Sequence, residues 1–407
     1  MNISWDARQV GKQAMRSWKA LLLGSALAVV AGCADEAAPA DVDTPVDEPV
    51  AEASVHQEIT GVELVGISVS EPGYHVWGGS PVISREDGRT HLFVARWPTE
   101  SSQTGLPATT PGDGFNNWFV DCEIAQYSAD SPEGPFTFER VVVEDQDGVF
   151  NSPHNPTIHY VDGKYALFFI VNEFDVTAKQ RIVMLTADTL DGPWAPHPGA
   201  EEDGTVLRQT TDPEIWSIIS DRGVTNPSFL KDPNPETEKP YLLFFKIRRG
   251  DNGRFDYGVA RSENLAGPYE FDKAPLTENA HIEDGYAFLE NGDVYLIVTD
   301  YEGRHERGGG LLYRSPDIVD VDFATEGPTP LFNPLADYAP EALEATAWRH
   351  KELPKGGLER PQALVIDGRA EYIYMAGTKN IASVADGTAN YLFRTVRDAG
   401  EEAGSAD

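Results

Sequence analysis

Cysteine is scarce in this chain. The 407 residues include two cysteines, Cys33 and Cys122. Small secreted domains that cannot build a sufficient core are usually held together by several disulfides, and two cysteines cannot form such a framework. The fold must therefore be stabilised by hydrophobic packing. The chain is long enough for one large domain or two ordinary domains with a full core.

Basic residues are also few. Lys and Arg number 32 against 66 Asp and Glu, which gives a formal net charge of −34 at pH 7. Nucleic-acid binding depends on the counterions that Lys and Arg release from the phosphate backbone. We therefore expect no nucleic-acid partner. The acidity is better explained by a solvated surface suited to a salty habitat than by a specific cationic partner.

The apolar run at the N-terminus is too short for a membrane-spanning helix. Residues 20–30 follow three basic residues and have the length of a signal-peptide core. The next residues, Val30-Ala31-Gly32-Cys33, resemble the lipobox of bacterial lipoproteins, in which the cysteine is lipidated. We predict a lipoprotein signal peptide over residues 1–33 with lipidation at Cys33. The alternative is an ordinary cleaved signal peptide and a secreted product.

The residues around the predicted lipid indicate where the protein resides. Ala34 rather than Asp follows Cys33, which favours the outer membrane in a Gram-negative cell. We expect a location in the bacterial cell envelope, with membrane contact through the lipid only. Residues 34–57 are rich in Ala, Asp, Glu, Pro and Val and contain no Phe, Trp or Tyr, which predicts a disordered acidic linker. A short disordered tail is predicted over residues 399–407.

Residues 58–398 contain a repeated pattern of short strands. Apolar or alternating runs recur between Gly, Pro, Asn and Asp, and no long amphipathic helix is evident. Five predicted hairpins open with a polar pair, and these pairs lie roughly 60 to 75 residues apart. The five pairs are Ser80-Pro81, Asn155-Pro156, Asn226-Pro227, Asp284-Gly285 and Arg360-Pro361. Closing five such units into a ring protects the sheet edges. We predict an all-β monomer, a five-bladed β-propeller of four-stranded antiparallel blades.

Several motifs resemble those of known enzymes. The opening pairs, together with a repeated Gly-Pro turn, are similar to those of the five-bladed glycoside hydrolases of families 43 and 117. The segments W-G-G-S-P-V-I, H-N-P-T-I-H, I-E-D-G-Y-A-F and E-R-P-Q-A-L resemble poorly characterised propellers of polysaccharide-degrading bacteria. The resemblance spans residues 74–394 and implies a carbohydrate substrate. It also allows a structural calcium ion in the central channel, for which no ligand set is legible.

The resemblance points to carboxyl groups as catalysts. The innermost strands of a propeller line a central funnel, so the five opening pairs should meet at one pocket. Glycosidases use one protonated and one ionised carboxyl group. Glu283 corresponds to the general acid of family 43, and Asp300 is a candidate base. Asp284 is expected on the opposite face of the strand from Glu283, so that one of the two acts as a hydrogen-bonding brace.

The chain also departs from the family 43 pattern. Ser80 stands where that family has its catalytic base in the first blade, and Asn226 stands where it has a second aspartate in the third. Neither residue can act as a carboxylate base, so the standard mechanism cannot be transferred intact. Because family 117 uses a histidine as acid, His154 and His281, which adjoin opening pairs, are further catalytic candidates.

Basic, aromatic and amide residues near the opening pairs are candidates for substrate binding. Arginine binds carboxylate or sulfate through two parallel hydrogen bonds, which suits uronic or sulfated algal glycans, although internal ion pairs are equally compatible with the sequence. Aromatic planes stack on sugar faces. The candidates are Trp77, Arg96, Trp97, Asn155, Asn226, Lys246, Arg248, Asp284, Tyr286 and Arg360.

Three functions are compatible with these residues. The first is a glycoside hydrolase. The second is a polysaccharide lyase that removes the C5 proton of a uronate with His or Tyr while Arg neutralises the carboxylate. The third is a surface propeller that binds glycan without catalysis. No zinc-type cluster, phosphate loop or nucleophile elbow is evident in the sequence. The sequence leaves the sugar, the linkage and the stereochemistry open.

Overall fold

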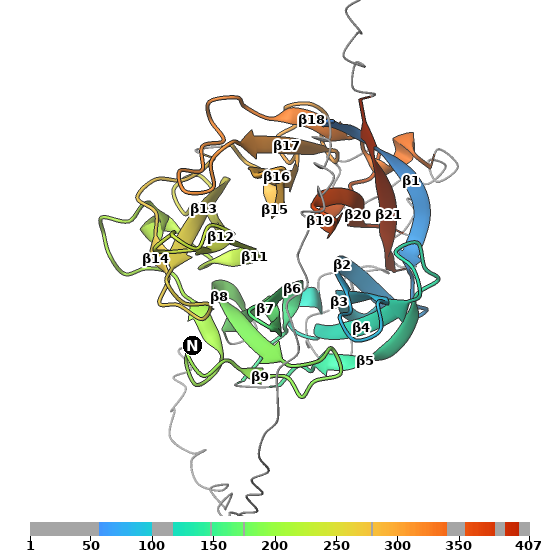
Figure 1. The fold of residues 1–407 in the computed structure, drawn as a ribbon, viewed down its shortest axis with the longest axis horizontal. Helices are drawn as coiled ribbons and strands as arrows, with labels where there is room; N and C mark the ends of the chain where they lie inside the picture. The colour runs from blue at the N-terminus through green and yellow to red at the C-terminus, as the bar shows by residue number, and fades with distance from the viewer. Residues whose placement is uncertain are drawn as a thin grey trace, which may run out of the picture. The chain divides into compact units, whose positions relative to one another are not determined.

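The described part of the computed structural model is built from five antiparallel sheets. It comprises residues 57–99, 117–146, 149–173, 176–277, 280–339, 355–378 and 387–398. The sheets are arranged around a central axis (Figure 1). The predicted five-bladed propeller is therefore confirmed. The predicted signal peptide with Cys33, the linker up to residue 56 and the tail lie outside the described residues. Within the described ranges, no helix has the length and hydrophobicity needed to cross a membrane.

Four blades follow the order of the chain, and each runs outward from an innermost strand. Blade one contains β2 (Tyr74–Ile83), β3 (Thr90–Pro98), β4 (Glu123–Ala129) and β5 (Thr137–Val143). Blade two contains β6 (His154–Val161), β7 (Lys164–Glu173), β8 (Val176–Ala187) and β10 (Thr205–Leu207), and the short β9 (Ala195–Pro196) also pairs with β8. Blade three contains β11 (Thr225–Lys231), β12 (Tyr241–Arg248), β13 (Phe255–Ser262) and β14 (Glu270–Phe271). Blade four contains β15 (Glu283–Glu290), β16 (Asp293–Thr299), β17 (Gly310–Ser315) and β18 (Thr329–Phe332).

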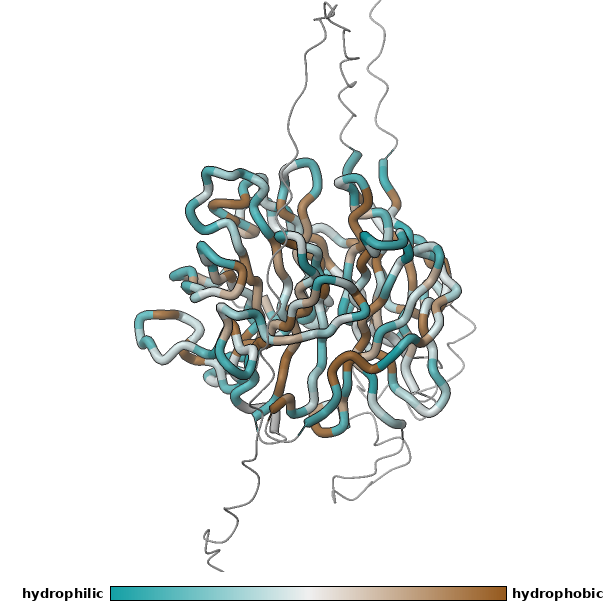
Figure 2. The backbone as a smooth tube through the Cα atoms, turned by 60° about the horizontal axis from the view of Figure 1, so that its bottom comes forward, coloured by the Kyte–Doolittle hydropathy of each residue, from teal (hydrophilic) through white to brown (hydrophobic). Residues whose placement is uncertain are grey.

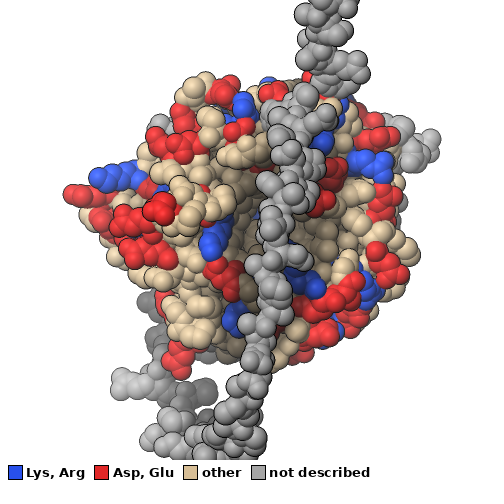
Figure 3. All heavy atoms as spheres, viewed as in Figure 1, with Lys and Arg blue, Asp and Glu red and all other residues tan. Residues whose placement is uncertain are grey.

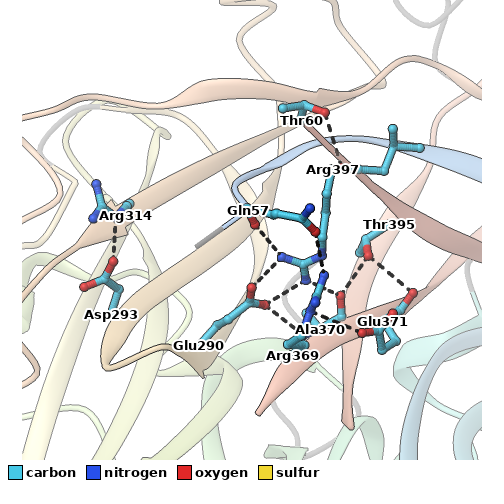
Figure 4. A network of polar contacts seen from close by, with 11 residues as sticks. Gln57, Thr60, Glu290, Asp293, Arg314, Arg369, Ala370, Glu371, Thr395 and Arg397 are labelled. Atoms are coloured by element: carbon cyan, nitrogen blue, oxygen red, sulfur yellow. Dashed lines mark hydrogen bonds and ion pairs between the residues drawn. The ribbon is translucent and has the colours of Figure 1, made fainter. Parts of the chain in front are cut away.

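The fifth blade joins the two ends of the domain. Its inner strands are β19 (Glu359–Ile366), β20 (Arg369–Thr378) and β21 (Thr388–Arg397), and its outermost strand is β1 (Ile59–Val69). Arg397 ties this closure to blade four, because its guanidinium binds the carboxylate of Glu290, which is 1% exposed (Figure 4). The same guanidinium donates to the Gln57 carbonyl oxygen at 2.9 Å. The position of β1 was not predicted from the sequence.

Neighbouring blades pack face to face through hydrophobic side chains. In β12, Leu243 and Phe245 pack against blade two, whereas Leu242 and Phe244 pack against blade four. Successive side chains of a strand point to opposite faces, and here both faces are covered, so the strand reads as a continuous hydrophobic run. Figure 2 shows such hydrophobic segments within the domain.

Each innermost strand contains one residue with a left-handed backbone. These residues have φ between 49 and 61° and lie beside a register shift in the pairing with the next strand; they are Gly78, Asn155, Asn226, Asp284 and Arg360. Gly, Asn and Asp adopt this conformation more readily than other residues. The bulge interrupts the strict alternation of side chains. The location of the bulge also corrects the predicted opening of blade one. The residue equivalent to Asn155, Asn226, Asp284 and Arg360 is Gly78, and the predicted Ser80 lies two residues further along.

Candidate active site

A cavity of about 610 Å³ is formed where the bulges of the five inner strands meet. The residue just before each left-handed position lines it, so every blade contributes one equivalent side chain. These residues are Trp77, His154, Thr225, Glu283 and Glu359. The predicted convergence on one pocket therefore holds for the opening pairs that begin at Asn155, Asn226 and Asp284, whereas neither residue of the pairs Ser80-Pro81 and Arg360-Pro361 lines this cavity. The face of the domain in Figure 3 is rich in acidic side chains and carries fewer basic ones.

Three of the left-handed residues also line the cavity and are linked by hydrogen bonds. The Asn155 amide nitrogen donates to the Asn226 oxygen at 2.9 Å, and the Asn226 amide donates to the Asp284 carboxylate. Asp284 was expected on the opposite face of the strand from Glu283. Instead, both line the same cavity, because the bulge and the positive φ of Asp284 break the alternation.

Glu283, the predicted acid, is held by an ion pair. The Lys246 ammonium nitrogen lies 2.8 Å from its carboxylate oxygen, and both side chains are largely buried. Glu283 is therefore brought to the cavity as predicted, and its partner Lys246 lines the cavity with it.

Glu359 is a further cavity residue that the sequence analysis did not select. Its pKa lies well above the ordinary value, because burial and the negative charges of Asp284 and Glu283 disfavour ionisation while Lys246 acts in the opposite direction. No described residue forms a hydrogen bond or ion pair with its carboxyl group. The available signal was positional: Glu359 precedes Arg360 as Glu283 precedes Asp284, in the corresponding opening pair of the next blade.

Asp284 lines the cavity beside these groups and interacts electrostatically with the buried Arg360. Burial raises the pKa of Asp284, as does Glu283, against the opposing effects of Lys246 and Arg360. Arg360 is 1% exposed, and its guanidinium donates to the Pro156 carbonyl oxygen at 3.4 Å. It does not line the cavity. Its position fits an internal counter-charge for Asp284 rather than the predicted substrate ligand.

His154 lines the cavity, but both of its ring nitrogens are engaged. Nδ1 lies 2.7 Å from the Ser152 carbonyl oxygen and therefore carries the proton, while Nε2 accepts from the Gln180 amide at 3.2 Å. Burial lowers the pKa of His154 to about 4. The ring is therefore neutral at physiological pH, and its geometry fits a wall-forming residue better than the predicted proton donor.

His281 also lines the cavity, between two aromatic rings. Its centroid lies 5.2 Å from that of Phe255 and 4.9 Å from that of Tyr301. Nδ1 accepts from the Phe255 backbone N–H at 3.3 Å, which leaves the proton of the neutral ring on Nε2. Burial lowers the pKa of His281. This predicted residue is thus present in the site in its neutral form.

Three other predicted residues lie away from this cavity. Asp300 is fully buried and accepts hydrogen bonds of 2.8 to 3.1 Å from the backbone N–H groups of residues 303–306, so it anchors a loop. Arg96 binds Glu71 and Glu123, each at 2.7 Å. Burial would lower the pKa of Arg96, but these hydrogen bonds outweigh it and raise the pKa. Tyr286 lines a different cavity, of about 820 Å³, formed by later residues of the inner strands.

The cavity has an aromatic side and a cationic side. Trp77, Trp97 and Trp118 contribute the aromatic side. Arg222 and Arg248 line the cavity together with Lys246. Arg248 pairs with Asp221, whereas Arg222 is partly exposed and has no carboxylate partner among the residues that the structure describes. Arg222 was missed because it lies in the loop before β11, outside any repeated motif.

The described residues provide no cluster of three or more His, Cys, Asp or Glu side chains arranged to hold a metal ion. The calcium ion allowed by the sequence resemblance therefore gains no ligand set here and stays a prediction.

The fold and the site define a five-bladed propeller with a carboxyl-bearing central cavity, and solved structures share this architecture. No protein-family model and no curated protein matches the sequence. A family 117 glycoside hydrolase from the marine bacterium Zobellia galactanivorans is 15% identical with a TM-score of 0.57, and the match covers 82% of this chain and 90% of that one. The GH43_1 enzyme from Xanthomonas citri is 11% identical with a TM-score of 0.51, covering 83% and 92%.

A third similar structure is a family 43 β-xylosidase/α-arabinofuranosidase from a compost microbial metagenome. It is 14% identical with a TM-score of 0.50, and the match covers 84% of this chain and 98% of that one. At these identities the similarity establishes the fold. The similarity confirms, at the level of the fold, the resemblance to the propellers of families 43 and 117.

Proposed function

We propose that this protein is a glycoside hydrolase that cleaves a glycosidic bond in its central cavity. The observation that carries the proposal is the gathering of Glu283, Asp284 and Glu359 in a cavity that also contains three tryptophans. Hydrolysis of a glycoside needs a protonated and an ionised carboxyl group, and aromatic planes bind sugar faces. The shared fold with glycoside hydrolases of families 117 and 43 supports this assignment.

The substrate that suits this cavity is an anionic oligo- or polysaccharide, with uronic or sulfated sugars. The chain has a net charge of −34, yet Arg222, Lys246 and Arg248 line the cavity. Arg222 has no acidic partner in the described part of the chain, so its guanidinium is available for a carboxylate or sulfate group. This argument supports the algal glycans suggested by the sequence.

The test uses the purified protein and a panel consisting of alginate, polygalacturonate, carrageenan and neutral arabinoxylan. We expect new reducing ends from at least one anionic polymer, without unsaturated uronates. Glu283→Gln should abolish this release, whereas Glu236→Gln, an exposed residue in the loop between β11 and β12, should not change it. Undiminished turnover by Glu283→Gln would contradict the proposed site.

A second candidate is a uronate lyase. The contact between His281 and Tyr301 in the cavity favours it, because a Tyr301 phenolate could take the C5 proton while Arg222 neutralises the uronate carboxylate. Products that absorb as unsaturated uronates would establish this reaction. Binding to the polymer array without either product would favour a non-catalytic glycan receptor, consistent with Ser80 and Asn226 at the positions where the family 43 pattern has aspartates.

We also propose that the propeller is anchored to the outer membrane through a lipid on Cys33. The lipobox and the acidic linker in the sequence support this location. Labelled palmitate should be incorporated into the full chain produced in a Gram-negative host and not into Cys33→Ser. Equal labelling of both proteins would contradict the proposal.

A further inference from the structure

We infer that Glu359 is the proton donor to the leaving glycosidic oxygen and that Glu283 is its ionised partner. This assignment rests on the proposed hydrolase function. It replaces the initial expectation that Glu283 is the acid, and it comes from the structural equivalence of the two residues and from the difference in what surrounds them.

Glu283 and Glu359 occupy equivalent positions on neighbouring inner strands. Each is the first residue of its strand, each precedes a left-handed residue, and both line the same cavity. Glu283 has a counter-charge, since its carboxylate lies 2.8 Å from the Lys246 ammonium nitrogen. Glu359 forms no ion pair or hydrogen bond through its carboxyl group with any described residue. Two carboxyl groups in different electrostatic surroundings are what acid and base roles require.

The charges around Glu359 favour its protonated form. From β15, Glu283 and Asp284 present negative charge, and from β12 only Lys246 opposes them. Asp284 interacts with Arg360, so the positive charge of this guanidinium is already engaged, and Asp284 also accepts a hydrogen bond from the uncharged Asn226 amide. On the blade-one side, the cavity-lining residue of β2 is the uncharged Trp77. Burial acts in the same direction and raises the pKa of Glu359.

The reaction follows from this arrangement. The bond between the anomeric carbon and the glycosidic oxygen breaks, its electron pair stays on that oxygen, and the oxygen takes the proton of Glu359. A water molecule forms the new bond to the anomeric carbon and gives a proton to the Glu283 carboxylate. Transfer of one proton from Glu283 through solvent to Glu359 restores both groups, so that one water molecule is consumed for each bond cleaved.

The kinetic test compares leaving groups of different acidity. The probes are 4-nitrophenyl and methyl glycosides of glucuronic acid, galacturonic acid, xylose and arabinose, together with any polysaccharide that the wild type cleaves. We expect Glu359→Gln to lose at least about 100-fold in kcat on methyl glycosides or polysaccharide. It should lose less than about 10-fold on 4-nitrophenyl glycosides, whose leaving group needs little protonation. Glu283→Gln should lose activity on both classes, and Glu236→Gln on neither.

A spectroscopic test does not depend on the substrate. Infrared spectra recorded along a pH titration should contain the C=O band of a protonated carboxylic acid in the wild type at pH values above the ordinary pKa of glutamate, 4.5. The band should vanish in Glu359→Gln and persist in Asp284→Asn, which separates the two carboxyl groups. A missing band, or one that persists in Glu359→Gln, overturns the assignment.

The two proposals fail in distinguishable ways. Hydrolysis by the wild type together with full activity of Glu359→Gln on methyl glycosides and polysaccharide overturns the donor assignment and leaves the hydrolase proposal intact. Absence of hydrolysis by the wild type on every probe, with unsaturated products or binding alone, overturns both.

Discussion

Replacement of Glu359 by glutamine should make the stability of the protein less sensitive to pH. The substitution exchanges a carboxyl group for an amide of nearly the same size and removes one ionisation. Because burial and the charges of Asp284 and Glu283 raise the pKa of Glu359, the folded protein keeps a proton that the unfolded chain releases above the ordinary value of 4.5.

The sign and the size of the effect follow from proton linkage. Between the unfolded and the folded pKa of Glu359, the unfolded state binds one proton fewer than the folded state, so the free energy of unfolding falls as pH rises. The slope is about 1.4 kcal/mol per pH unit, and the loss is about 1.4 kcal/mol one unit above the ordinary pKa. The contribution of Glu359 to the free energy of unfolding is fully present below pH 4.5 and is lost as pH rises through the pKa of Glu359 in the folded protein. In Glu359→Gln the free energy of unfolding does not decrease for this reason, because glutamine does not ionise.

Urea denaturation followed by tryptophan fluorescence measures this difference. We expect the unfolding free energy of Glu359→Gln, relative to wild type, to increase steadily from pH 4.5 toward neutral pH. Asp284→Asn should show the same trend, since burial also raises the pKa of Asp284, and Glu236→Gln should follow the wild type at every pH. Parallel curves for Glu359→Gln and wild type would refute the reasoning, because they would mean that Glu359 titrates alike in both states.

Three further predictions concern closure, backbone conformation and substrate charge. Arg397→Met should lower the unfolding free energy by about 3–5 kcal/mol in urea titrations, because it leaves the Glu290 carboxylate buried without its partner. Adding Glu290→Gln should restore part of the loss. A change below about 1 kcal/mol for Arg397→Met would contradict this reasoning. Gly78→Ala should lower stability by about 1–2 kcal/mol in thermal unfolding, because φ is +61° and the new Cβ would lie 3.2 Å from Arg360 atoms; an unchanged Tm would show that the bulge relaxes. Arg222→Gln should raise KM for an anionic polymer about 10-fold with little change in kcat, and it should weaken the salt dependence of KM. Equal effects of the substitution on a neutral glycoside would argue against recognition of the substrate's charge.

The blades could be predicted because their signals are local. A strand covered on both faces by neighbouring blades must be apolar at every position, as β12 is from Leu242 to Phe245. Turn residues mark the ends of such strands, and the repeat of hairpins gives their number. The same locality explains why Glu283 and Lys246, which line the cavity, could be selected from the sequence, since each lies on or beside a repeated element of the pattern.

The functional details were less accessible because they depend on departures from that pattern. The prediction assumed strict alternation of side chains and therefore placed Asp284 on the opposite face of the strand from Glu283. In the structure a bulge directs both side chains toward the same cavity. Asp300 and Arg96 have residue types suited to a site, yet loop N–H groups bind the first and two glutamates bind the second. Glu359 has the same kind of sequence context as Glu283, and only its surroundings distinguish it.

The sequence alone therefore determined the repeat, the strand content and the five-bladed ring, since each blade is specified by residues close together in the chain. The tertiary structure decided the rest. It placed β1 in the last blade, joined the two ends of the domain, and brought Glu283 and Glu359 together across neighbouring blades. The physical reason is that protonation and pairing depend on burial and on charges from other blades, which are remote in sequence.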